Sequence, residues 1–292
     1  MKRALIFAGQ GSQYVGMTRD LSEAFAPARD LVLRANDILG YDLRSIMENG
    51  PEDVLRQTKY TQPALFVHEA ALLACTDVRS SAAAVAGHSL GEYSALHAAG
   101  VLSFDDALQL VQLRANLMFE AGERIPGTMA AVVGLDDDSV RAICAELNEG
   151  GSKVIVPANF NSPGQVVVSG SAEHVRACMP IFKERGAKLV KELQVSGAFH
   201  SPLLADAEAG LAERIRATAF HTAEIPVYVN VSAQPVTDSD ALREAAIRQL
   251  TAPVLWTATM MTMWSDGITA YREIGPGKVL QGLVKRTVTE AT

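Results

Sequence analysis

The sequence predicts an α/β fold built on a parallel sheet, and two short apolar runs are the main reason. Residues 4–8 and 82–86 are entirely apolar, and a glycine follows each run. Short apolar runs of this kind are typical of strands buried in a parallel sheet. Helical stretches alternate with them, which favours the same architecture. The chain has 292 residues, of which 48% are hydrophobic, so it can bury a large core.

The first part of the chain carries the helices that connect and follow these strands. We expect helices at about 18–39, 51–57, 62–77 and 90–99. Gly100 is a stop signal for the last of them. Ser103 then opens a further helix, because Asp106 stands three residues later in a capping-box arrangement.

Residues 126–196 show a different pattern, which predicts a small inserted subdomain. The expected elements are a strand at 127–135, a helix at 136–149, strands at 153–160 and 165–169, a helix at 171–185 and a strand at 187–195. This β-α-β-β-α-β order is that of a ferredoxin-like unit. The large domain then comprises residues 1–125 and 197–292. Its second part has an expected helix at 202–219, strand at 226–231, helix at 239–250 and strand at 270–274.

Charge and composition exclude several classes of protein. The 33 acidic and 26 basic residues give a net charge of −7 without a basic block, which disfavours nucleic-acid binding. The N-terminal apolar run is too short for a signal peptide, and no run reaches the length of a membrane span. The three cysteines are far apart and odd in number, which favours reduced thiols. We therefore expect a soluble, cytoplasmic protein.

No motif for a cofactor is present. The segment Gly9-Gln-Gly-Ser-Gln13 lacks the third glycine of a dinucleotide loop, because Tyr14 occupies that place. The segment Gly275-Pro-Gly-Lys278 lacks the spacing of a P-loop. Histidines and cysteines do not occur at the spacing of metal ligands. We expect neither a nucleotide cofactor nor a metal.

Residues 87–91 are the candidate site of a nucleophile. Gly87-His-Ser-Leu-Gly91 fits the G-x-S-x-G nucleophile elbow, and the expected strand before it and helix after it are the context that this motif requires. The glycines permit a sharp turn that raises Ser89 above the end of the strand. The N-terminus of the following helix offers backbone N–H groups to an oxyanion. Ser89 is the candidate nucleophile, and the alternative is a purely structural turn.

A serine nucleophile needs a general base, and His200 is the candidate among six histidines. It lies in the segment Ser196-Gly-Ala-Phe-His-Ser-Pro202, between the last strand of the subdomain and the next helix. Loops at domain boundaries line clefts, where a base is needed. The other histidines stand in helices, next to the nucleophile or before a strand, and these positions favour structural roles.

Arg114 is the candidate substrate contact. It lies in the middle of an apolar helical face formed by Leu110, Val111, Leu117 and Met118. An unpaired buried guanidinium is unfavourable. Two interpretations stay open at this point: an internal acid pairs with Arg114, or Arg114 binds the carboxylate of a ligand through two parallel hydrogen bonds.

The chain as a whole resembles the malonyl-coenzyme A:acyl-carrier-protein transacylases, including discrete acyltransferases of polyketide synthesis. The matching segments occur in the family's order over nearly the whole chain. They are Phe7-Ala-Gly-Gln-Gly-Ser-Gln13, Thr61-Gln-Pro63, Gly87-His-Ser-Leu-Gly-Glu-Tyr93, Gln112-Leu-Arg114, Asn161-Ser-Pro-Gly-Gln165, Gly197-Ala-Phe-His200, Gln249-Leu-Thr-Ala-Pro253 and Glu273-Ile-Gly-Pro-Gly-Lys-Val279. The resemblance implies the family's fold, an α/β-hydrolase-like domain with a ferredoxin-like subdomain, which agrees with the inserted subdomain expected above at residues 126–196.

The resemblance implies a catalytic dyad of Ser89 and His200. Ser89 takes an acyl group from coenzyme A as an ester, and His200 acts as general base and then as general acid. The backbone carbonyl of Gln249 orients the imidazole, and no carboxylate completes a triad. The implied oxyanion hole is formed by the backbone N–H groups of Gln10 and Leu90.

The resemblance also implies substrate and partner contacts. Arg114 matches the arginine that binds the carboxylate of malonyl. Phe199 matches the malonyl-selecting pattern, because relatives that use methylmalonyl usually carry serine there. Lys188, Lys285 and Arg286 match positions near the mouth of the cleft, where an acidic carrier protein is expected to bind. Ordinary solvated charges are the alternative for these three residues.

The implied reaction is a ping-pong transfer of malonyl from malonyl-CoA to the phosphopantetheine thiol of an acyl carrier protein, by a monomer that needs no cofactor. The sequence leaves open whether the carrier belongs to fatty-acid or polyketide synthesis. One alternative is an editing hydrolase that removes acyl groups from carrier proteins, although Arg114 argues against it. Others are an α/β serine hydrolase, which needs a later histidine and an orienting acid, and a non-catalytic docking module.

Overall fold

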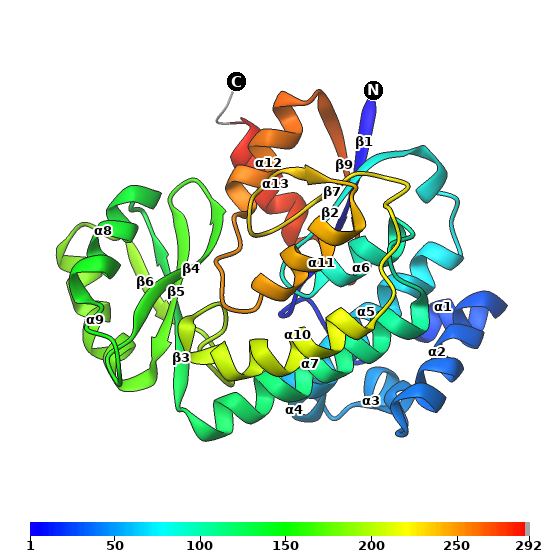
Figure 1. Ribbon diagram of the computed structural model, residues 1–292, viewed down its shortest axis with the longest axis horizontal. Helices are drawn as coiled ribbons and strands as arrows, with labels where there is room; N and C mark the ends of the chain where they lie inside the picture. Colours follow the sequence, from blue (N-terminus) through cyan, green and yellow to red (C-terminus); the bar gives the residue numbers. More distant parts are fainter. Residues whose placement is uncertain (290–292) are drawn as a thin grey trace.

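A five-stranded sheet lies at the centre of the larger part of the computed structural model, which describes residues 1–289 (Figure 1). Its order is β8-β7-β2-β1-β9, and the strands are β1 (Lys2–Phe7), β2 (Ala82–Gly87), β7 (Val227–Tyr228), β8 (Pro235–Val236) and β9 (Ile268–Ile274). All neighbours pair in parallel except β7 and β8, which are antiparallel. The predicted α/β class with a parallel sheet is confirmed.

Both faces of this sheet are buried, as a parallel sheet requires. Alternate residues of β1 belong to two different cores: Leu5 and Phe7 to a large one, Ala4 and Ile6 to a smaller one. The helices of the larger part are α1 (Arg19–Ala24), α2 (Ala26–Leu39), α3 (Leu43–Asn49), α4 (Glu52–Leu55), α5 (Thr58–Ala74), α6 (Gly91–Ala98), α7 (Phe104–Arg124), α10 (Ala205–Ala217), α11 (Ser239–Arg248), α12 (Trp256–Ser265) and α13 (Val279–Thr289), with single 3-10 turns at Arg79–Ser81 and Pro202–Leu204. The smaller core packs against α12 and α13.

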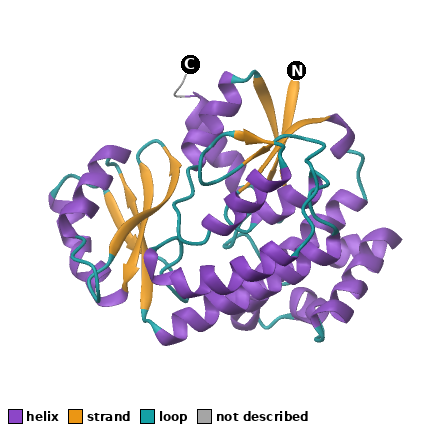
Figure 2. Cartoon of the chain, in the orientation of Figure 1, coloured by secondary structure: helices purple, strands orange, loops and turns teal. Residues whose placement is uncertain are grey.

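A second, four-stranded sheet lies beside the larger part of the molecule (Figure 2). Its antiparallel order is β4-β5-β3-β6, from the strands β3 (Gly127–Val133), β4 (Ile155–Ser162), β5 (Gln165–Ser171) and β6 (Leu189–Glu192). The helices α8 (Asp137–Leu147) and α9 (Ala172–Glu184) pack on one face, where Ala130 and Val132 are buried. The alternate residue Met129 belongs to the large core instead. The second face of this sheet is therefore turned toward the larger part.

The predicted order of elements in residues 126–196 agrees with β3-α8-β4-β5-α9-β6, whereas several predicted boundaries elsewhere were wrong. The expected helix at 18–39 is divided at Phe25, whose extended backbone makes it the N-cap of α2, and Pro27 is accommodated in the first turn of that helix. The expected helix at 62–77 begins earlier, so that Pro63 lies inside α5 and not in its first turn. Thr58 and every residue from Thr61 to Ala71 are buried, and such packing outweighs local preference. The helices α3, α12 and α13 were not predicted.

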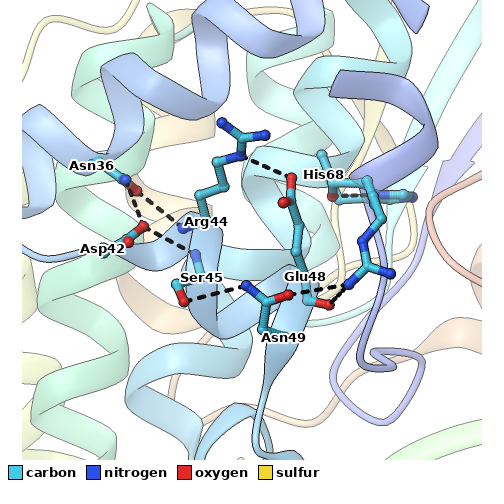
Figure 3. Close-up of polar contacts among 9 residues, drawn as sticks. Asn36, Asp42, Arg44, Ser45, Glu48, Asn49 and His68 are labelled. Carbon is cyan, nitrogen blue, oxygen red and sulfur yellow. Dashed lines mark hydrogen bonds and ion pairs between the residues drawn. The ribbon is translucent and has the colours of Figure 1, made fainter. Parts of the chain in front are cut away.

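Polar contacts explain the short helix α3 (Figure 3). Asp42 is its N-cap and accepts a hydrogen bond from the Ser45 backbone N–H at 3.0 Å. The side chain of Asn36 accepts from the Arg44 backbone N–H at 3.1 Å and donates to Asp42 at 2.9 Å. Arg44 and Glu48 form an ion pair one turn apart. These contacts satisfy the first turn of a seven-residue helix that hydrophobic periodicity alone does not reveal.

The part of the chain that the structure describes has no helix with both the length and the hydrophobicity needed to cross a bilayer.

Candidate active site

A sharp turn at the end of β2 carries Ser89. Its φ of 52° lies in the left-handed region, which is unfavourable for residues other than glycine. The flanking glycines are required by close approach: a Cβ on Gly87 would lie 1.9 Å from the Gly91 carbonyl oxygen, and one on Gly91 would lie 2.3 Å from the Phe7 oxygen. The turn therefore places the serine at the carboxyl end of the sheet, beside the N-terminus of α6.

His200 meets this serine from a loop that begins after β6. Its Nε2 lies 2.8 Å from Ser89 Oγ, and its Nδ1 lies 3.0 Å from the Gln249 carbonyl oxygen and 3.1 Å from that of Ala252. Carbonyl oxygens only accept hydrogen bonds, so Nδ1 carries the proton and Nε2 accepts from the Ser89 hydroxyl. His200 is also left-handed, with a φ of 55°.

The surroundings of His200 keep its imidazole neutral. Burial first, and then the positive charge of Arg114, lower its pKa to about 3, although the two carbonyl contacts act in the opposite direction. The imidazole is therefore unprotonated at neutral pH and ready to accept the serine proton.

Arg114 lies beside the same serine. The residue is 1% exposed. It donates from Nη1 to Gln62 Oε1 at 2.7 Å, and from Nη2 to Ser89 Oγ at 3.0 Å and Gln249 Oε1 at 3.1 Å. Within residues 1–289, no carboxylate forms an ion pair with Arg114, and its Nε has no hydrogen-bond partner. Of the two interpretations, an internal ion pair is therefore not the one that the fold adopts.

Gln249 connects the three groups through separate atoms. Its backbone oxygen accepts from His200, its side-chain oxygen accepts from Arg114, and its side-chain nitrogen donates to the Ser89 carbonyl at 2.8 Å. The sequence predicted only the backbone contact. The side chain therefore adds a link between the serine turn and the arginine.

Two backbone N–H groups beside Ser89 are available to an oxyanion. Gln10 and Leu90 both line the cavity at Ser89, and neither of their N–H groups donates to any residue between 1 and 289. The N–H of Ser89 itself is occupied, because it donates to Asn230 Oδ1 at 2.8 Å. The side chain of Gln10 donates to Thr58 Oγ1 at 3.2 Å, which anchors the loop that follows β1.

A cavity of about 170 Å³ opens onto these groups. Phe199 forms part of its wall, and the second sheet contributes Met129 and Val167. A further cavity of about 220 Å³ shares Gln10, His88 and Asn161 with the first and extends to Arg286. His88 is directed at Asn161, with Nε2 2.8 Å from Oδ1. The two cavities are therefore neighbours, and residues from both sheets line them.

The structure does not bring all predicted contact residues to this cleft. Arg286 borders the second cavity, whereas Lys188 and Lys285 are exposed and line neither of the two. Lys188 lies just before β6 in the small sheet, and Lys285 lies on α13.

The sequence analysis missed Gln62 as a partner of Arg114 and Asn230 as a partner of Ser89. Gln62 precedes the proline of the Thr61-Gln-Pro63 segment, but its contact lies 52 residues away in the chain. Asn230 interrupts an apolar run at the carboxyl end of a predicted strand, which is where ligand sites form in open α/β sheets. That position was the available signal for Asn230.

Comparison with known proteins agrees with this geometry. Residues 4–292 match the family model described as "Acyl transferase domain". The malonyl CoA-acyl carrier protein transacylase of Escherichia coli is 42% identical over 99% of this chain and 94% of that protein, and the one from Staphylococcus aureus is 42% identical over 98% and 92%. The chain belongs to this family. The predicted resemblance is confirmed, and the protein is an acyltransferase.

Two solved structures are similar over the same range. The acyl carrier protein S-malonyltransferase of Vibrio cholerae has a TM-score of 0.93 at 42% identity, covering 99% of this chain and 94% of that one. A malonyl-transacylase solved in complex with its type II PKS acyl-carrier protein has a TM-score of 0.93 at 40% identity, with the same coverage. Among the described residues of this acyltransferase, no cluster of three or more histidine, cysteine or acidic side chains could hold a metal ion.

Proposed function

We propose that this acyltransferase moves malonyl from malonyl-CoA, through an ester on Ser89, to the phosphopantetheine thiol of an acyl carrier protein. The observation that carries this proposal is the contact of 3.0 Å between the Arg114 guanidinium and Ser89 Oγ. In a malonyl ester the carboxylate carbon is the third atom from Oγ. The buried guanidinium therefore lies within reach of that carboxylate and identifies a dicarboxylic acyl group as the substrate.

Loading begins with proton transfer from Ser89 Oγ to His200 Nε2, which is favoured by their contact of 2.8 Å. Oγ then attacks the thioester carbonyl carbon. The resulting oxyanion accepts hydrogen bonds from the backbone N–H groups of Gln10 and Leu90. When the intermediate collapses, the C–S bond breaks, and His200 returns its proton to the departing sulfur of coenzyme A.

Transfer to the carrier repeats these steps in reverse order. His200 accepts the proton of the phosphopantetheine thiol, and the sulfur attacks the ester carbonyl. The C–Oγ bond breaks, and Oγ regains a proton from His200. The Gln249 and Ala252 carbonyls stabilise the imidazolium that exists between the two transfers, because both accept from Nδ1.

The carboxylate is proposed to bind the Nε–Nη2 edge of Arg114. Nε has no partner among residues 1–289, and one Nη2 hydrogen on the same edge contacts Ser89 Oγ, a bond that would pass to the carboxylate once Oγ has become an ester oxygen. Gln62 and Gln249 hold Nη1 and Nη2 without neutralising the charge. A planar guanidinium held in this way offers two parallel hydrogen bonds to a carboxylate.

Phe199 is proposed to favour malonyl over methylmalonyl. Phe199 is 6% exposed as a residue and forms part of the cavity wall next to His200. A methyl branch on the acyl group would meet this ring. Discrimination of one methyl group in a pocket amounts to about 1–3 kcal/mol, so the preference is expected to be about 10- to 200-fold.

The second cavity is proposed as the route of the phosphopantetheine arm, with Arg286 at its border. Lys188 and Lys285 are exposed outside the cavity lining and are proposed as carrier contacts on the surface. Acidic carrier proteins need local positive charge on a chain whose net charge is −7. These three residues supply such charge. A monomer that works in the cytoplasm without a cofactor stays a prediction.

We also propose the division into a large domain, residues 1–125 and 197–292, and a subdomain, residues 126–196. Strands β3 to β6 pair with one another in a sheet of their own, and within residues 1–289 one isolated bridge, between Asn159 and Val254, joins them to the larger part.

Intact-mass measurement after brief mixing with malonyl-CoA, methylmalonyl-CoA or acetyl-CoA tests the function. We expect a malonyl adduct on the wild-type chain that is absent from Ser89→Ala and passes to an added holo carrier protein. Ser94→Ala is the matched control, because this buried serine is near the site but has no role in the proposed chemistry. A malonyl adduct that is lost to water before the carrier is added would instead indicate an editing hydrolase.

A further inference from the structure

Asn230 makes an unusual set of contacts with the nucleophile turn. It is fully buried, and its side chain bonds to the backbone on both sides of His88. Oδ1 accepts from the Ser89 N–H at 2.8 Å, and Nδ2 donates to the Gly87 carbonyl at 2.7 Å. The turn has left the sheet at this point, so neither backbone group has a strand beside it.

The register of the sheet explains this arrangement. Strands β2 and β7 pair in parallel, with Ala86 opposite Tyr228. Continuing the register places His88 opposite Asn230. A residue in a parallel ladder donates to the carbonyl before its partner and accepts from the N–H after it. The side-chain amide of Asn230 makes these two bonds in place of a backbone, and thus extends the ladder by one residue.

The backbone of Asn230 is engaged elsewhere. Its N–H donates to Glu92 Oε2 at 2.5 Å, and its carbonyl accepts from the Leu255 N–H at 3.0 Å. Glu92 lies in the first turn of α6, which starts directly after the nucleophile turn. Asn230 therefore holds both the turn and the helix behind it.

We propose that Asn230 is a positioning residue for acyl transfer, which keeps Ser89 in its left-handed conformation and reserves the Leu90 N–H for the oxyanion. The bond from Ser89 N–H fixes the peptide plane that aims Oγ at His200. The bond to Gly87 fixes the start of the same turn. This inference rests on the proposed role of Ser89 as the nucleophile.

The test compares Asn230→Ala with the wild type in two reactions of Ser89. The first is single-turnover loading from malonyl-CoA, and the second is modification by a small alkyl fluorophosphonate, which has no carboxylate for Arg114. We expect both rate constants to fall about 100-fold, as for a nucleophile displaced by about 1 Å. The KM for malonyl-CoA should stay within about threefold of the wild type, because the arginine and the cavity are unchanged.

The matched control is Asn36→Ala. The Asn36 side chain also accepts from a backbone N–H and donates to an oxygen, but it lies between α2 and α3 (Figure 3). This variant should alter the melting temperature without altering either rate. Equal rates in Asn230→Ala and the wild type would overturn the proposal. So would a loss of malonyl loading with unchanged phosphonate modification, because that result would place Asn230 in substrate binding.

If the alanine variant does not fold, Asn230→Asp tests the positioning role of Asn230 instead. A protonated aspartate can accept from Ser89 and donate to Gly87, whereas the ionised form cannot donate. The phosphonate rate of Asn230→Asp, divided by that of the wild type, should therefore rise as pH falls from about 8 to about 5.5, through the range of a buried carboxyl. Glu92, Arg114, His88 and His200 are the titratable groups around the turn, and they are present in both proteins.

A ratio that does not change with pH would overturn the proposal. The phosphonate reaction also separates this inference from the proposed function. A wild-type protein that reacts with the phosphonate but never accepts malonyl would refute malonyl transfer and leave the role of Asn230 intact.

Discussion

Replacing Arg114 by alanine removes the group proposed to bind the substrate carboxylate. A bidentate contact with the Nε–Nη2 edge comprises two charge-assisted hydrogen bonds, each worth about 1.5–3 kcal/mol. At about 1.4 kcal/mol for each factor of ten, their loss should lower kcat/KM for malonyl-CoA about 10²- to 10⁴-fold. Acetyl-CoA carries no carboxylate. It should lose about tenfold or less, because the contact between Nη2 and Ser89 Oγ is the one lost contact that involves a reacting atom of this substitution.

The assay is rapid-quench loading of Ser89 from malonyl-CoA and acetyl-CoA, followed by intact-mass analysis. Arg114→Lys is the matched variant. It keeps the positive charge but loses the planar fork, so it should fall between alanine and the wild type for malonyl-CoA. Removing the guanidinium also leaves the side-chain oxygens of Gln62 and Gln249 without their donor, so the melting temperature should be measured in parallel.

Equal losses for the two acyl groups would refute the assignment, because a carboxylate contact cannot affect a substrate without a carboxylate. A loss confined to the melting temperature would have the same meaning. It would show that Arg114 supports the packing of α7 and does not select the substrate.

Three further predictions concern protonation and backbone geometry. Burial, and then Arg114, lower the pKa of His200 to about 3, so kcat/KM for acetyl-CoA should stay level as pH falls below about 6.5. In Arg114→Ala, the decline of kcat/KM at low pH should begin at a higher pH than in the wild type. A decline of the wild-type kcat/KM near pH 6.5 would contradict this prediction. Burial raises the pKa of Glu69 well above its usual range, so the folded state keeps a proton that the unfolded chain releases above about 4.5. The free energy of unfolding therefore falls as pH rises from about 4.5 to the raised pKa of the folded state, and Glu69→Gln should remove up to about 1.4 kcal/mol of that fall per pH unit. If the melting temperatures of the variant and the wild type change equally with pH between about 5 and about 8, this prediction is wrong. Gly91→Ala should abolish Ser89 loading and lower the melting temperature, because its Cβ would lie 2.3 Å from a backbone oxygen of β1. A Cβ on Gly282 would meet no atom within 4 Å, so Gly282→Ala should keep the loading rate and the melting temperature of the wild type.

Patterns that span a few residues were reliable guides to local structure. The cap at Ser103 was predicted from Asp106 three residues later, and Ser103 Oγ indeed accepts from the Asp106 N–H at 3.1 Å. The apolar runs at 4–8 and 82–86 form adjacent parallel strands. These features depend on backbone preferences and on the burial of short segments, which are encoded where they occur in the chain.

The helices that escaped prediction lack such patterns. Residues 256–265 contain threonine, methionine and tryptophan in nearly every position, so no polar face marks a helical period. Residues 279–289 combine a glycine with several β-branched side chains, which weaken helix propensity. Packing of both segments against the smaller core stabilises helices there in spite of these preferences.

The sequence by itself determined the elbow at Ser89, the apolar helical face around Arg114 and the ferredoxin-like order of residues 126–196. Only the tertiary structure decided which groups these features meet. Arg114 contacts Gln62 and Gln249, which are 52 and 135 residues away, and Ser89 contacts Asn230 at a separation of 141 residues. Such contacts depend on the order and register of the strands, which set the positions of loops that share no local pattern. A glutamine or asparagine therefore acquires its role from the place to which the sheet brings it.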